Sequence, residues 1–342
     1  SGTGDSNQPA IEIVTGTTDT TINGVDSQDE KDIIDIRVDA SALAGQVVGS
    51  TNQVLALQGT AEYFILNNTD NETLYLDIGS IADDNTVTLG GSGDFELTGT
   101  SADVDATDLT GDITVRTKDG NTPDDDIIVR AGTGVTPVDA IDAGDKITLE
   151  AGLLLDDEDD TDNESTTDVT EVVIEGAGTV VVNDLKADLD ASAFAGQLEI
   201  TRGQITGGAI DDVDIIVGAN GGSVDLGQAI NQTYIDASNM VTTKTLSLQG
   251  DNANVRVDRV ASGAIIDASG AGTTPLTGEM EVITLDGASG VNVKTGTAIT
   301  SVTSDGGSVD IEADELTDTM TLVGSSAFVV TGLETNVVAS ST

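Results

Sequence analysis

The sequence predicts an all-β chain folded as a β-solenoid, similar to a parallel β-helix, with tandem β-sandwich domains as the alternative. Three features support this fold class: strand-length apolar runs, weak helical periodicity and short internal repeats. Only 2% of the residues are aromatic. This favours the narrow core of a solenoid, because sandwich cores usually hold larger side chains.

The expected strands are short runs of Val, Ile and Leu bounded by Gly, Asp, Asn and Thr. They recur about every 8 to 12 residues, a spacing typical of all-β chains. Because β-branched residues favour the buried face of a sheet, these runs argue against disorder despite the high charge. The clearest runs are Ile33-Ile34-Asp35-Ile36, Ile127-Ile128-Val129, Val172-Val173-Ile174, Val180-Val181-Val182 and Ile215-Ile216-Val217.

A short phrase that begins with Asp-Ala-Ser, or a close variant, recurs along the chain and predicts a corner followed by a strand. Its aspartate is expected to accept hydrogen bonds from nearby backbone N–H groups, and its Leu, Phe or Met is expected to point inward. The spacing between such phrases differs between the two halves of the chain by about 20 residues, which fits one coil of a solenoid. The copies lie at 39–46, 105–112, 190–197, 236–240 and 267–270.

The charge of the chain limits its partners. It has 12 Lys and Arg against 61 Asp and Glu, a formal net charge of −49. Such a chain repels itself unless cations or a polar surface supply counter-charge. Nucleic acid is excluded as a partner, because phosphate binding needs clustered Lys and Arg. No membrane span is expected either, since no apolar stretch approaches the ~20 residues that a spanning helix needs.

Calcium is the expected cofactor, because Ca2+ takes about six to eight oxygen ligands and clustered carboxylates supply them. The alternative interpretation of each acidic cluster is a solvated loop between repeats. Asp39, Asp105, Asp190 and Asp236 are instead expected to shape corners, so a chelator should affect only the clusters. The candidate calcium ligands are Asp124, Asp125 and Asp126, then Asp156, Glu158, Asp160 and Asp162, and finally Asp211, Asp212 and Asp214.

The composition argues against an enzyme. Without His or Cys the chain cannot build a Ser-His-Asp or Cys-His arrangement. A two-carboxylate polysaccharide lyase or hydrolase remains a low-weight alternative because acidic residues abound. However, three Tyr, four Phe and 12 cations provide little of the surface that sugar-cleaving clefts use.

The Asp-Ala-Ser phrase, set among Thr-, Val-, Gly- and Asp-rich strands, resembles the repeated regions of Gram-negative S-layer proteins. It is also similar to haemolysin-type (RTX) calcium-binding surface proteins. The resemblance covers residues 36–342 and implies a calcium-dependent surface lattice. The RTX calcium nonapeptide, Gly-Gly-x-Gly-x-Asp, is incomplete here: Gly90-Gly91-Ser92-Gly93-Asp94 lacks one spacer, and Gly221-Gly222-Ser223-Val224-Asp225 lacks the third glycine.

We expect four segments along the chain. These are an N-terminal strand and assembly segment at 1–35, a first β-repeat region at 36–155, an acidic linker at 156–170 and a second β-repeat region at 171–342. Apolar runs at 11–14, 327–330 and 337–339 are interpreted either as ordinary cap strands or as strands donated to a neighbouring subunit. Local charge pairing and subunit contact are both open for the isolated cations Arg37, Arg116, Arg130, Arg256 and Arg259.

Together these features predict a secreted, extracellular structural protein at a cell surface. We expect it to assemble with copies of itself into an S-layer or a surface filament stabilised by calcium, with cell-surface polysaccharide as a further partner. The alternative is a monomeric calcium-binding adhesin or matrix-binding module.

Overall fold

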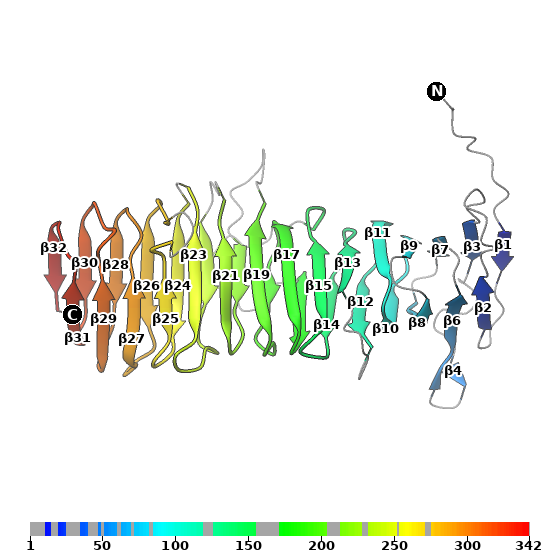
Figure 1. Ribbon diagram of the computed structural model, residues 1–342, viewed down its shortest axis with the longest axis horizontal. Helices are drawn as coiled ribbons and strands as arrows, with labels where there is room; N and C mark the ends of the chain where they lie inside the picture. The colour runs from blue at the N-terminus through cyan, green and yellow to red at the C-terminus, as the bar shows by residue number, and fades with distance from the viewer. Residues whose placement is uncertain are drawn as a thin grey trace, which may run out of the picture. The chain divides into compact units, whose positions relative to one another are not determined.

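The structure is a computed structural model. It describes residues 11–14, 20–24, 35–39, 47–48, 51–59, 63–69, 72–81, 85–118, 126–154, 171–203, 213–227, 232–251, 253–270 and 275–341. The chain forms two compact units, Ser1–Leu154 and Leu155–Thr342. In each unit, successive coils add one strand to each of two parallel sheets, so each unit is a β-solenoid (Figure 1). The predicted fold class is confirmed, and the parallel pairing excludes the β-sandwich alternative.

The first unit builds two sheets from alternate strands. Every pair within them is parallel, and one short antiparallel pair, β4 (Val47–Val48) with β5 (Thr51–Asn52), stands apart. The first sheet contains β1 (Ile11–Val14), β3 (Asp35–Asp39), β7 (Tyr63–Asn68), β9 (Thr86–Gly91), β11 (Asp103–Leu109), β13 (Asp126–Arg130) and β15 (Lys146–Glu150). The second contains β2 (Thr20–Gly24), β6 (Val54–Gly59), β8 (Leu74–Ile81), β10 (Phe95–Thr100), β12 (Ile113–Thr117) and β14 (Thr136–Ala140).

The second unit repeats this arrangement, and Figure 1 shows its strands following one another side by side. One sheet contains β17 (Thr179–Leu185), β19 (Gln197–Arg202), β21 (Gly221–Asp225), β23 (Thr245–Gln249), β25 (Ile265–Asp267), β27 (Ser289–Lys294), β29 (Ser308–Glu312) and β31 (Ala327–Thr331). The other contains β16 (Val172–Gly176), β18 (Leu189–Asp190), β20 (Val213–Ile216), β22 (Thr233–Asp236), β24 (Val255–Val260), β26 (Met280–Thr284), β28 (Thr300–Thr303), β30 (Met320–Val323) and β32 (Val337–Ser340).

The core of each unit consists of columns of aliphatic side chains that stack from coil to coil. Alternate residues of a strand face inward, because successive side chains of a strand point to opposite faces. In the first unit Leu76 is paired with Leu97 and Leu97 with Val115, and all three are 0–1% exposed. Leu, Val, Ile and Ala side chains fill most of this narrow interior, which is why few aromatics suffice.

The length of a coil varies around the expected 20 residues. Met280 is paired with Thr300 and Thr300 with Met320, so one coil takes 20 residues there. Elsewhere Thr86 is paired with Asp103, a step of 17, whereas Val104 is paired with Val129, a step of 25. The turns absorb most of this difference, and some strand pairs, such as β9 with β11, also shift register within the strand. The described residues contain no helix long and apolar enough to cross a membrane.

Candidate functional site

The structure places only two of the ten predicted calcium ligands. Asp126 is the first residue of β13, and Asp214 lies half-buried in β20. The other eight, and the predicted linker at 156–170, lie outside the described residues. Within the described ranges, no three acidic side chains are grouped so that they could hold a metal ion. The remaining predicted ligands are Asp124, Asp125, Asp156, Glu158, Asp160, Asp162, Asp211 and Asp212.

The corner aspartates do what the sequence predicts. The Oδ1 atom of Asp190 accepts a hydrogen bond from the backbone N–H of Ser192 at 2.7 Å, and that of Asp236 accepts one from Ser238 at 2.9 Å. Asp105 likewise accepts from Thr107, at 3.2 Å. These contacts to the residue two positions later are Asx turns, which fix the chain as it leaves a strand. The turn that would follow Asp39 lies outside the described residues.

The apolar residue of the phrase also points inward as expected. Phe194 is 2% exposed, Met240 4% and Leu109 1%. At Gly196 an added Cβ atom would meet both the carbonyl oxygen of Gly178 and the ring of Phe194. The glycine is therefore needed for close packing of the corner against the previous coil.

A second set of carboxylates, which the sequence pattern does not predict, connects one coil to the next. In the first unit Asp94 accepts from the N–H of Asp112, and Asp112 accepts from the N–H of Val135, both at 2.9 Å. Each acceptor stands immediately before a strand, as Asp94 does before Phe95. Asp94 is also part of the incomplete calcium nonapeptide, and its Oδ1 atom accepts this backbone hydrogen bond.

The second unit repeats this contact between coils. Glu171 accepts from the N–H of Asp188 at 3.2 Å, and Asp188 accepts from the N–H of Asp214 at 2.7 Å. Asp214, a predicted calcium ligand, is therefore part of a structural ladder through its backbone. The sequence pattern that marks this ladder is an acidic residue directly before an apolar strand, as in Glu171-Val172 and Asp188-Leu189.

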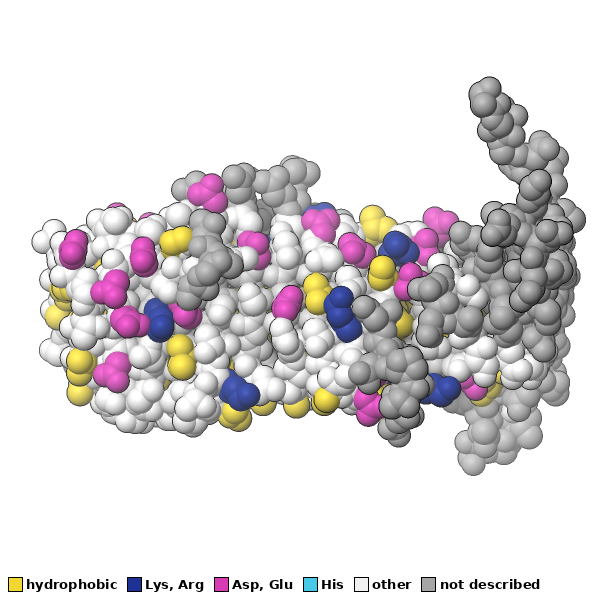
Figure 2. Space-filling model, in the orientation of Figure 1, with side chains coloured by type: hydrophobic (Ala, Val, Ile, Leu, Met, Phe, Trp, Pro, Cys, Tyr) yellow, Lys and Arg dark blue, Asp and Glu magenta, His cyan; other side chains and the backbone are white. Residues whose placement is uncertain are grey.

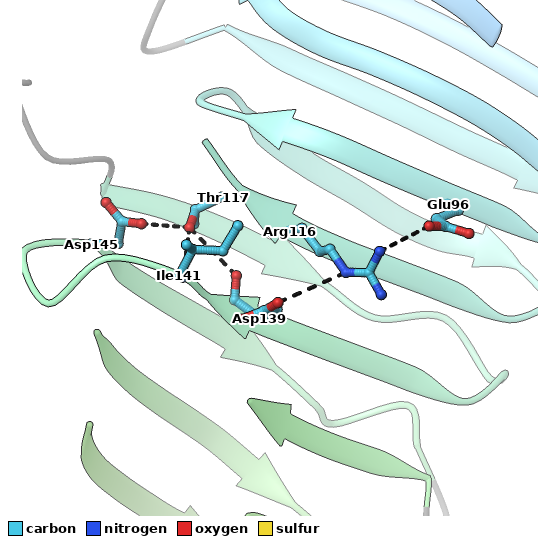
Figure 3. A network of polar contacts seen from close by, with 6 residues as sticks. All are labelled: Glu96, Arg116, Thr117, Asp139, Ile141 and Asp145. Atoms are coloured by element: carbon cyan, nitrogen blue, oxygen red, sulfur yellow. Dashed lines mark hydrogen bonds and ion pairs between the residues drawn. The ribbon is translucent and has the colours of Figure 1, made fainter. Parts of the chain in front are cut away.

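A polar network in the first unit shows how a cation is used (Figure 3). The Arg116 guanidinium on β12 lies 3.0 Å from Glu96 on β10 and 3.8 Å from Asp139 on β14. The three residues come from consecutive coils of one sheet. Arg116 therefore separates two carboxylates that would otherwise repel each other across its coil.

The same network continues inward from Arg116. The Thr117 hydroxyl contacts Oδ2 of Asp145 at 2.5 Å and accepts from the N–H of Ile141 at 3.0 Å. The Asp145 side chain is fully buried and also accepts from the N–H of Asp142 at 3.1 Å. A buried carboxylate needs such partners, because an unpaired charge in the core is strongly unfavourable. This group thus fixes the turn between β14 and β15.

Two cations of the second unit are also placed between acidic residues. Lys294 on β27 lies 4.0 Å from Asp267 on β25 and 3.3 Å from Glu312 on β29. Arg256 on β24 lies 2.9 Å from Asp258 and 3.8 Å from Glu281 on β26. Figure 2 shows the Lys and Arg side chains of one face scattered among more numerous Asp and Glu, without a basic patch.

Arg256 combines these contacts with the ring of Tyr234, whose centroid lies 5.9 Å from the guanidinium carbon. Burial lowers the pKa of Arg256, but its hydrogen bond to Asp258 and the charges of Asp258 and Glu281 outweigh burial. The pKa is therefore raised above its ordinary value. Arg259 contacts Asp236, so it also pairs locally. Arg116, Arg256 and Arg259 thus follow the local-pairing interpretation.

The final coil of the second unit differs from the coils before it. We call residues 324–341 the last coil; it carries β31 and β32. Val329 and Val338 face outward and are 54% and 55% exposed, and Val337, which continues the inward column of the buried Met320, is 39% exposed. Among its residues only Glu334 is charged. This coil therefore carries fewer charges than the rest of this acidic chain.

Comparison with protein-family models, with curated proteins and with solved structures finds no match to this chain.

Proposed function

We propose that the protein is a secreted structural protein that assembles with copies of itself at a cell surface, as an S-layer or a filament, and that calcium stabilises the assembly. The β-solenoid supports a structural role, because it is a stack of repeated coils that presents extended, regular surfaces.

The observation that carries this proposal is how the described coils use their cations. Arg116, Arg256 and Lys294 each contact two carboxylates of their own chain. With 12 cations against 61 acidic residues, the remaining negative charge requires counter-ions from outside. Subunits of this charge can approach one another only if those counter-ions lie between them. Calcium suits this role, since it binds several carboxylate oxygens at once.

Chelation tests this proposal directly. The purified protein would be examined by negative-stain electron microscopy and sedimentation with calcium, with the same ionic strength of sodium chloride, and with calcium followed by excess chelator. We expect ordered arrays or filaments with calcium alone. A protein that stays monomeric in all three conditions contradicts the proposal and favours the monomeric adhesin. Turnover in a glycan-cleavage screen would favour the lyase or hydrolase.

Two variants that lose the same number of negative charges test whether the acidic cluster at 156–162 binds calcium. One, the cluster variant, changes that cluster, and the other, the control, changes acidic residues elsewhere. We expect the cluster variant to require more calcium for assembly and the control to behave as the parent. Equal calcium dependence of the two would contradict the assignment of the cluster. The cluster variant carries Asp156→Asn, Glu158→Gln, Asp160→Asn and Asp162→Asn. The control replaces four exposed acids outside the clusters: Glu175→Gln, Asp286→Asn, Asp310→Asn and Glu315→Gln.

A further inference from the structure

Two tyrosines stand at equivalent places in the two units. Tyr75 on β8 and Tyr234 on β22 both belong to a Tyr-x-Asp phrase, and both point outward between buried residues of their strand. The aspartates of the phrase, Asp77 and Asp236, each accept a hydrogen bond through Oδ1 from the backbone N–H two positions later, at 3.1 and 2.9 Å. The two tyrosines therefore occupy the same position of one structural repeat.

The strand after each tyrosine carries a bulge at the same place. β10 and β24 each shift register against the following strand, and the bulge residue has a positive φ, 65° at Gly99 and 54° at Arg259. A positive φ is uncommon for a long side chain, and a bulge re-aims the side chains around it. The Arg259 side chain is 62% exposed and contacts Asp236. The bulge thus brings a guanidinium to β22, the strand of Tyr234.

In the first unit, a carboxylate and a guanidinium lie next to the tyrosine. Glu96 on β10 is the register partner of Tyr75, and its Oε1 atom lies 3.0 Å from Nη1 of Arg116 (Figure 3). Asp139 contacts the other side of the same guanidinium. The Glu96 and Arg116 side chains are 28% and 42% exposed. A hydrogen-bond acceptor and a donor beside Tyr75 are therefore both accessible from solvent.

The second unit brings the same kinds of group together. Arg256 on β24 is the register partner of Tyr234, and it contacts Asp258 and Glu281 as well as the ring. The Arg256 and Glu281 side chains are 34% and 41% exposed. We call each group a tyrosine site. The first consists of Tyr75, Glu96, Arg116 and Asp139, and the second of Tyr234, Asp236, Arg256, Asp258, Arg259 and Glu281.

The packing of the core does not explain the two rings. Phe95 and Phe194 are buried, and Phe328 is in register with the buried Val309, so these phenylalanines face inward. Among the side chains that the structure describes, Tyr75 and Tyr234 are the only aromatic ones on the outer faces of the sheets. A tyrosine on an outer face offers a large, rigid contact area with a polar end, which suits ligand binding.

A sugar ring matches the groups of a tyrosine site. The C–H groups of a pyranose can stack on the negative face of an aromatic ring. Its hydroxyls can donate to carboxylate oxygens and accept from guanidinium N–H groups. Carboxylates outnumber cations in both sites, by two to one in the first and three to two in the second. In a chain of net charge −49, this composition favours a neutral ligand over an anionic one.

The surroundings of the sites favour an extended glycan over a protein partner. The outward neighbours of Tyr75 include Asp77, Thr98 and Thr114, which are polar. A stable protein interface has an apolar centre instead. Adjacent strands also present their outward side chains in rows about 4.8 Å apart, so a polymer can contact several of them in succession.

We propose that the two tyrosine sites bind a neutral polysaccharide, with sugar rings stacked on Tyr75 and Tyr234 and sugar hydroxyls bonded to the neighbouring carboxylates and guanidinium groups. This inference adds a ligand to the proposed structural role. It does not rest on self-assembly or on calcium, because no group of a tyrosine site is a predicted calcium ligand.

Tyrosine fluorescence tests the ligand class. The chain has no Trp and only three Tyr, so ligand binding at the two sites is visible in the tyrosine emission. The purified protein would be titrated in excess chelator, where the proposed assembly is absent, with dextran, mannan, laminarin and the anionic polymer polygalacturonate. We expect a saturable change in emission with at least one neutral polymer and none with polygalacturonate.

Variants test the sites themselves, with binding measured by affinity gel electrophoresis. Tyr75→Ala/Tyr234→Ala should weaken binding of the neutral polymer by more than about ten-fold, because the stacking surface is lost. Tyr75→Phe/Tyr234→Phe keeps both rings and should stay within about three-fold of the parent. The matched control, Ile128→Ala/Ile265→Ala, truncates half-buried outward residues on the other sheet of each unit and should bind as the parent does. Circular dichroism checks that each variant keeps its β-structure.

The outcomes separate this proposal from the proposed function. A parent protein that binds none of the neutral polymers overturns the proposal, and so does an alanine variant that binds as well as the parent. Tighter binding of polygalacturonate than of the neutral polymers overturns the ligand class. Each of these results leaves calcium-dependent self-assembly standing, whereas a parent protein that binds a neutral polymer but never assembles overturns self-assembly alone.

Discussion

The inner coils and the last coil of the second unit have the same arrangement of strands, but their side chains differ in burial and charge. On β24 and β26 the inward residues Val257 and Val282 are fully buried, and the outward Arg256 and Glu281 form a charged column. On β31 and β32 the equivalent positions are partly or fully exposed, and the outward residues are uncharged. Within the described residues each inner coil therefore pairs with two neighbours, and the coil of β31 and β32 pairs with one. In such a protein, stability is a sum of contacts between adjacent coils.

The largest expected effect comes from the same substitution made in the two environments. Phe194→Ala removes a buried ring and should lower the free energy of unfolding by about 3–5 kcal/mol. Phe328→Ala, in the half-buried β31, should lower it by less than about 2 kcal/mol, because less area leaves water on folding. Urea unfolding followed by circular dichroism measures both. Equal losses would show that the last coil is as well covered as the inner coils.

A smaller effect is expected for carboxylates. Asp145→Ala removes a buried acceptor from the Thr117 hydroxyl and from the N–H of Asp142, and should cost about 1–3 kcal/mol. Asp145→Asn keeps one acceptor oxygen and should cost less. Asp318, near the last coil, is exposed and accepts from the N–H of Thr319, which water can also satisfy. Asp318→Ala should change stability by no more than about 0.5 kcal/mol. A larger loss for Asp318 than for Asp145 would reverse the comparison.

The smallest effect is expected for the charged columns. Arg256→Gln and Lys294→Gln should each lower the free energy of unfolding by less than about 1 kcal/mol, and sodium chloride should reduce the difference. Because the pKa of Arg256 is raised, its contribution is present below its ordinary pKa and is lost only as pH rises through the raised value. This loss lies in strong alkali, so the effect of Arg256→Gln should be constant from mildly acidic to mildly alkaline pH. A salt-independent loss of several kcal/mol in the free energy of unfolding would contradict the interpretation of these contacts as weak, partly exposed ion pairs.

The sequence predicts the architecture because the solenoid depends on local patterns. The runs at 127–129, 172–174 and 180–182 lie in β13, β16 and β17, and the Asp-Ala-Ser phrase forms the predicted corners at Asp190 and Asp236. Both signals depend on neighbouring residues: alternation of side chains in a strand, and an acceptor two positions before an N–H group.

The contacts between coils could not be predicted in the same way. Asp112 accepts from Val135, 23 positions later, and Asp188 accepts from Asp214, 26 positions later. Because coil length varies between turns, the sequence does not show which residues become neighbours. The segment Gly221–Asp225 illustrates the same limit: it resembles a calcium motif but forms strand β21, with Val224 facing the core.

The coil-by-coil pairing has a mechanical consequence. Each inner strand is bonded only to the coils before and after it, so a force applied to the chain at the last coil peels off one coil before it loads the next. Where Met280, Thr300 and Met320 mark successive coils of 20 residues, each event should release roughly 66–72 Å of extended chain. Single-molecule stretching would record this as a series of similar steps. A stack of this kind lengthens under load in small increments, so it dissipates work where a single cooperative domain would fail at once.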